Sequence, residues 1–166
     1  TTDPFPGDPQ LGFLTLDLLR ENVSATKMSV DRRLEQLPML LEASKVADNF
    51  QMFDAVIVEL TAEVLTDVQL QTTASILDRR TALKSTHTTS SESTETFWKT
   101  VLKRSRSGED QWLEASLQLA TIDVQKRNYQ HALKVINVID ALHPDWGTSE
   151  RKSRAAALKM RLESAR

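Results

Sequence analysis

The segment WLEASLQLATIDVQKRNYQHALKVINVIDALHPDW, residues 112–146, decides how the rest of the chain is interpreted. Its apolar residues recur every three or four positions, first around Leu117 and again from Tyr129 onward, which is the spacing of amphipathic helices. Polar residues 125–128 interrupt this pattern, and Pro144 ends it because proline cannot continue a helix. We therefore predict two short helices joined by a tight turn. The first is apolar on more than one side, as expected of a helix packed between neighbours.

Five positions of this hairpin match a known repeat. Leu119 and Ala120 form a large–small pair in the first helix, Ala132 is a small residue early in the second, Ile136 follows four positions later, and Pro144 terminates the unit. The hairpin resembles a tetratricopeptide repeat, whose period is about 34 residues with the pattern W-x₂-L-G-x₂-Y…A-x₃-F…P. The small residues at 120 and 132 suit two helices that approach closely.

Two positions depart from the repeat pattern. Ser116 replaces its first large aromatic residue, although Trp112 lies one turn earlier, and Asp123 replaces its tyrosine. The resemblance covers Leu113 to Trp146 and leaves an unrelated helical hairpin as the alternative. It implies a stack of antiparallel hairpins that binds peptides in a groove lined by the first helix of each.

The composition predicts an all-α fold. The chain has 166 residues, of which 40% are hydrophobic and 27% charged, an ordinary balance for a soluble domain. Only 4 Gly and 5 Pro are present, and no alternating strand pattern is bounded by glycine. We expect antiparallel helical hairpins, stacked in a short tetratricopeptide-like array or bundle, within one domain.

The chain order predicts four segments. Residues 1–8 are expected to be a flexible leader, residues 9–84 an N-terminal helical region, residues 85–96 a Ser/Thr-rich loop, and residues 97–166 the hairpin with a C-terminal capping helix. The start at Thr1 suggests a processed product or a fragment of a larger protein.

Local signals predict helix ends within residues 9–84. Ser29 and Asn49 are expected to cap two helices, and Pro38 must kink the first of these or start a new one. Thr66 and Gln69 form a capping box, which favours two helices over one long helix across residues 50–84.

Charge gives no sign of a nucleic-acid partner. The formal net charge is −2, and a basic cluster at 103–106 and another at 151–154 are each expected to be a solvated face. No apolar run reaches the roughly 18 residues of a membrane-spanning helix. We expect neither nucleic-acid binding nor membrane insertion.

No pattern indicates catalysis or a cofactor. The chain has no cysteine and three scattered histidines, and it carries none of the common catalytic or phosphate-binding motifs. Asp140 and His143 lie at helical spacing, but a metal site needs more ligands. We predict no catalytic residue, no metal and no cofactor.

The predicted function is a non-catalytic scaffold that binds a protein or peptide or other parts of its parent chain. The candidate binding strip lies on the first helix of the hairpin and comprises Glu114, Leu117, Thr121, Val124 and Gln125. The competing interpretation is that the helix around Trp98 or the C-terminal helix covers this strip. A nucleic-acid-binding helical array and an all-α enzyme with an unrecognised site are the alternative functions.

Overall fold

The computed structural model describes residues 28–83 and 90–164 of the chain. These residues form seven α-helices and no strand, so this part of the protein is all-α as predicted. The chain divides into two compact units, and the boundary falls between Thr94 and Glu95.

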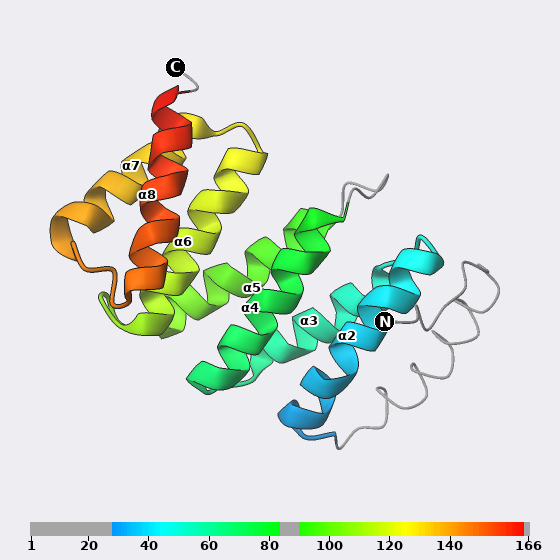
Figure 1. Cartoon of the computed structure of the whole chain (residues 1–166). Coiled ribbons are helices and arrows are strands. Elements are labelled where there is room, and N and C mark those ends of the chain that lie inside the picture. Colours follow the sequence, from blue (N-terminus) through cyan, green and yellow to red (C-terminus); the bar gives the residue numbers. More distant parts are fainter. Residues whose placement is uncertain (1–27, 84–89, 165–166) are drawn as a thin grey trace. The chain divides into compact units, whose positions relative to one another are not determined.

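Unit 1 is built around α2 (Val30–Val46), which packs against both α3 (Gln51–Ala62) and α4 (Asp67–Ala82) (Figure 1). Each helix buries one apolar face, as its sequence period requires. The buried residues include Leu34, Leu37, Leu41, Phe53, Ile57, Leu60, Leu70 and Leu77.

The predicted helix ends of unit 1 follow local capping. The hydroxyl of Ser29 accepts the backbone N–H of Arg32, and Thr66 and Gln69 form the predicted capping box. The break between α3 and α4 is thereby confirmed. Pro38 lies inside a continuous α2 and starts no new helix. The side chain of Asn49 accepts the N–H of Gln51 at 3.1 Å, one residue before the N-cap of α3.

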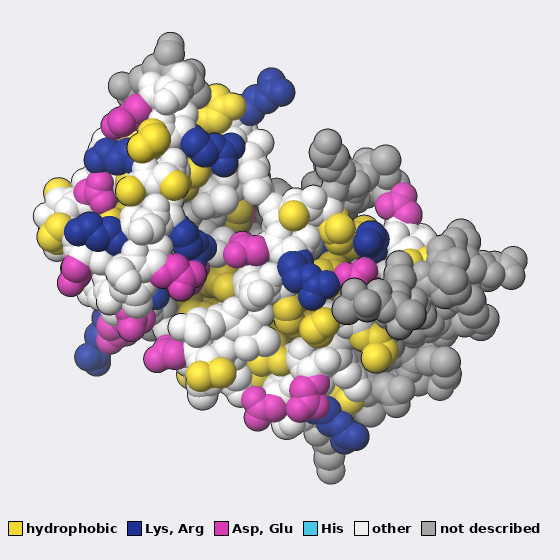
Figure 2. Space-filling view, in the orientation of Figure 1, with side chains coloured by type: hydrophobic (Ala, Val, Ile, Leu, Met, Phe, Trp, Pro, Cys, Tyr) yellow, Lys and Arg dark blue, Asp and Glu magenta, His cyan; other side chains and the backbone are white. Residues whose placement is uncertain are grey.

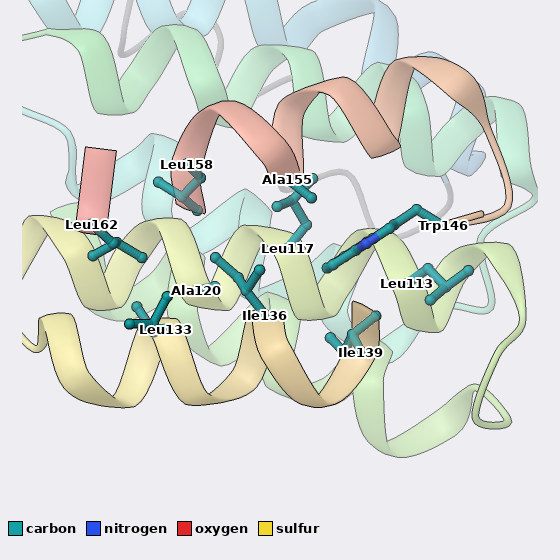
Figure 3. Close-up of a cluster of buried hydrophobic side chains, with 11 residues drawn as sticks. Leu113, Leu117, Ala120, Leu133, Ile136, Ile139, Trp146, Ala155, Leu158 and Leu162 are labelled. Carbon is teal, nitrogen blue, oxygen red and sulfur yellow. The ribbon is translucent and has the colours of Figure 1, made fainter. Parts of the chain in front are cut away.

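Unit 2 contains α6 (Asp110–Gln125), α7 (Tyr129–Leu142) and α8 (Ser149–Ser164), which follow α5 (Ser90–Arg104), the helix that crosses the boundary. The predicted helices of residues 112–146 are α6 and α7, joined at Lys126–Asn128, where Arg127 has a φ of 63°. In Figure 3, Leu133 lies beside Ala120 whereas Ile139 lies nearer Leu113, so the two helices are antiparallel.

The third helix of unit 2 packs against both members of this hairpin. The hydroxyl of Thr148 accepts the N–H of Arg151 at 3.2 Å and so caps α8. The narrow apolar stripe of α8, which is Ala155, Leu158 and Leu162, is buried.

The predicted Ser/Thr-rich loop over residues 85–96 is too long, because α5 already begins at Ser90. Within α5, the buried residues Thr94, Phe97 and Trp98 recur at helical spacing. An anchored helix can extend outward through polar residues, so a polar composition alone was not sufficient to predict a loop there. The predicted leader, residues 1–8, the first part of the N-terminal helical region, residues 9–27, and loop residues 84–89 lie outside the described residues.

Candidate functional site

The predicted binding strip on α6 is mostly covered. Leu117 is 1% exposed and Glu114 is also buried, while Thr121 and Val124 are half-buried. The hydroxyl of Thr121 donates to the carbonyl oxygen of Leu117 at 2.9 Å. Gln125, the last residue of α6, is exposed. The strip is therefore not an open docking surface at Glu114 and Leu117.

Leu117 is covered because it belongs to the hydrophobic core of unit 2. Figure 3 draws this core, in which α6, α7 and α8 each contribute side chains. Ala120 and Ala132 belong to the same cluster, and the half-buried Val124 packs against it. At Leu117 the strip is covered in part by α8, whereas Gln125 at its other end is exposed.

Glu114 is held by two arginines of α8. Arg151 donates from Nε to Oε2 of Glu114 at 3.0 Å, and Arg154 donates from Nη1 to Oε1 at 3.0 Å. Gln118 donates to Oε1 at 3.1 Å. The expectation that the basic cluster 151–154 forms a solvated face is wrong for Arg151, which is buried, because a carboxylate 37 residues earlier compensates its charge.

The same arginine joins the loop before α8 to α6. Its Nη1 donates to the backbone oxygen of Trp146 at 2.8 Å and to Oδ1 of Asp110 at 3.0 Å. The close contact between this loop and α6 depends on Gly147, whose φ is +73°. A Cβ added at this position would lie 2.5 Å from Oδ1 of Asp110. Glycine is favoured there because other residues rarely adopt this backbone conformation.

This buried polar cluster has the chemistry of a structural clamp. Burial alone raises the pKa of Glu114, but the charge of Arg154 and the hydrogen bonds from Gln118, Arg151 and Arg154 outweigh burial and lower it. Both carboxylate oxygens already accept hydrogen bonds. A general base must accept a proton, so its pKa should lie near the working pH. A carboxylate whose pKa is lowered and whose two oxygens are already paired is poorly suited to that role. The arrangement favours packing over catalysis.

Asp140 and His143, the pair considered as metal ligands, have separate partners. Asp140 accepts from Nε1 of Trp146 at 2.7 Å and from Nζ of Lys159 at 2.8 Å, whereas the ring of His143 packs against Trp112. Burial alone raises the pKa of Asp140, but these hydrogen bonds outweigh burial, so the pKa is lowered overall. Within residues 28–83 and 90–164, no three His, Cys, Asp or Glu side chains gather as metal ligands do.

Unit 1 contains a second buried cation. Arg80 is 1% exposed, and its guanidinium carbon lies 3.5 Å from the ring centre of Phe50. In the part of the chain that the structure describes, its Nε and Nη1 have no hydrogen-bond partner. Burial lowers the pKa of Arg80, while the charges of Asp54 and Asp48 raise it. The pKa of Asp54 is raised, because the effect of burial outweighs the hydrogen bond from Ser93 and the charge of Arg80, which both lower it.

The outer face of α7 is the candidate site of the described chain. Val138 and Leu142 lie one turn apart and are 48% and 64% exposed. Beside them is a shallow hollow of about 420 Å³. It is lined by Gln130, Leu133, Lys134, Asn137, Val138 and Ala141. We call these six residues and Leu142 the α7 face.

The surroundings of the α7 face give it contrast. Figure 2 shows the surface over α8 and the edge of α7, where hydrophobic side chains stand singly between charged ones. Single exposed apolar residues are common on proteins and need no partner. Val138 and Leu142 differ from these single residues because they lie one turn apart on the same helix, next to a hollow.

Comparison with protein families, with curated proteins and with solved structures found no match. No helix in the described segments has the length and apolar character needed to cross a membrane.

Sequence reasoning missed the α7 face although a signal was present. The residues 132–142 include apolar side chains on a wider arc than one core face needs, and Val138 and Leu142 are the excess. The buried Arg151 had no local signal, because its partner Glu114 is distant in sequence.

Proposed function

We propose that this chain is a non-catalytic helical scaffold that binds a protein or peptide through the α7 face. The observation that carries the proposal is the hollow on α7 beside Val138 and Leu142, whose side chains are 48% and 64% exposed. The polar cluster around Glu114 adds support, because it fixes α8 against α6 and so makes α7 part of a rigid support.

We further propose that α6, α7 and α8 are a tetratricopeptide-like hairpin with its capping helix. The antiparallel pairing of α6 and α7, the shared core position of Ala120 and Ala132, and the packing of α8 on both helices support this proposal. Small residues at a helix crossing let two backbones approach closely, which is the physical use of such positions in these repeats.

The docking function is tested with a matched pair of charge substitutions. Val138→Asp alters the α7 face, and Met160→Asp alters a residue of α8 that is 69% exposed. Both changes place a carboxylate in water, so neither should change the melting temperature by more than about 2 °C, in line with surface substitutions. We expect Val138→Asp to lose capture of the partner in a pull-down with the full chain, while Met160→Asp retains it. Equal capture by both variants would reject the α7 face.

A further inference from the structure

The residues that line the hollow all belong to α7. They are Gln130, Leu133, Lys134, Asn137, Val138 and Ala141. These positions advance by three and one alternately, so they form one straight face of one helix, about 17 Å long at 1.5 Å per residue. Helices pack by placing a ridge of side chains into such a groove.

The backbone of α7 cannot recruit a partner strand. Its amides and carbonyls between Tyr129 and Leu142 are committed to the helix itself. A partner that adds as a strand needs free main-chain groups, whereas a partner helix uses side chains alone. The α7 face therefore favours a helix with an apolar stripe.

The charge of the α7 face favours a partner helix with acidic residues beside its apolar stripe. Lys134 is the charged residue among those that line the hollow, and it is exposed. Its neighbours one turn away on α7 are Gln130, His131, Asn137 and Val138, none of which is a carboxylate. Within the described ranges no carboxylate pairs with Lys134, whereas Lys126 pairs with Glu95 and Lys159 with Asp140. An incoming carboxylate would meet Lys134 without breaking an existing pair.

The same distribution disfavours a second copy of the chain. The α7 face carries a cation and no anion, so two such faces would bring two lysines together without compensation. Like charges opposed across an interface oppose association.

We propose that the α7 face receives an amphipathic helix whose apolar stripe is flanked by carboxylates, one of which pairs with Lys134. This inference rests on the proposed docking function and adds the class of partner. Val138 and Leu142 contact the apolar stripe, and Lys134 selects the acidic edge.

The test uses two fluorescein-labelled peptides of 18 residues and the full chain. Both peptides are Ala-rich helices with one leucine stripe; the stripe is flanked by glutamates in one and by lysines in the other. Fluorescence anisotropy measures their affinities for the parent, for Lys134→Glu and for the control Lys103→Glu. Lys103 is an exposed residue of α5, so its reversal changes net charge equally.

We expect the parent to bind the glutamate peptide about tenfold more tightly than the lysine peptide, because an exposed attraction is exchanged for a repulsion. Lys134→Glu should reverse this order, and Lys103→Glu should preserve it. Equal affinities for the parent, no binding of either peptide, or reversal by Lys103→Glu would overturn the proposal. A dimer of the chain that Val138→Asp dissociates would also overturn it, by assigning a second copy instead. The capture experiment with Val138→Asp judges the docking function separately from these outcomes.

Discussion

Replacement of Leu117 by aspartate would test most severely whether α6 is covered on this side. Leu117 is 1% exposed in the core of unit 2. Truncating such a leucine to alanine costs about 2–5 kcal/mol. A carboxylate placed there must stay charged without a partner or become protonated, and a pKa raised by about 3 units adds about 4 kcal/mol at neutral pH.

The sum is comparable with the whole stability of the unit. A unit of about 70 residues has roughly 4–10 kcal/mol available, so Leu117→Asp should unfold unit 2 at neutral pH or leave it barely folded. Leu117→Ala should remain folded with a lower melting temperature. Acidification toward pH 4 should narrow the difference in stability between Leu117→Asp and Leu117→Ala, because a neutral carboxyl group costs less to bury.

Intrinsic fluorescence reports this result for unit 2 specifically. The three tryptophans of the chain, Trp98, Trp112 and Trp146, all lie within residues 95–166. Urea titrations followed by tryptophan emission should give a greatly reduced midpoint for Leu117→Asp. Val138→Asp is the control, since it places the same charge on the exposed face of α7. A midpoint for Leu117→Asp equal to that of the control would refute the covered position of Leu117.

Four further predictions concern the packing of the helices and the two carboxylates whose pKa values are shifted. Ala132→Leu should overpack the hairpin and cost about 1–3 kcal/mol, whereas Ala141→Leu, on the exposed side of the same helix, should leave the urea midpoint nearly unchanged; equal midpoints would argue against the close crossing. The lowered pKa of Glu114 means that its contribution to stability is complete above the unfolded value of about 4.3 and is lost as pH falls through the folded value. The parent should therefore lose stability toward acid relative to Glu114→Gln. The raised pKa of Asp54 predicts the opposite slope against Asp54→Asn, as measured by circular dichroism. Gly147→Ala should cost more than about 1 kcal/mol, because its φ is +73° and its Cβ would meet a carboxylate oxygen of α6; an unchanged melting temperature would contradict this geometry.

Local signals predicted helix ends well because the responsible interactions are local. Thr66 and Gln69 cap α4 through atoms three residues apart, and Thr148 caps α8 in the same way. Pro144 lies just after α7, where the ring prevents helix continuation. The helical class of unit 2 and the bounds of its hairpin followed from these residues and the apolar period.

The choice between helix faces could not be predicted in this way. The helix α6 is apolar on several sides, so the environment of Leu117 depends on α8, which lies more than 30 residues later. Glu114 and Arg151 are charged residues that a local interpretation places in water, although together they form a buried pair. Burial of such a pair depends on tertiary contacts, and only the assembled helices supply them.

Site-specific photocrosslinking tests the central claim, that partners dock on the α7 face, most directly. A photoreactive phenylalanine analogue is introduced into the full chain at Val138 and, as the matched control, at Met160, both exposed residues of unit 2. We predict a discrete covalent adduct with the partner from position 138 and none from position 160, and excess unlabelled parent should suppress it while excess Val138→Asp does not. Adducts of equal yield from both positions, or an adduct from position 160 alone, would contradict the account.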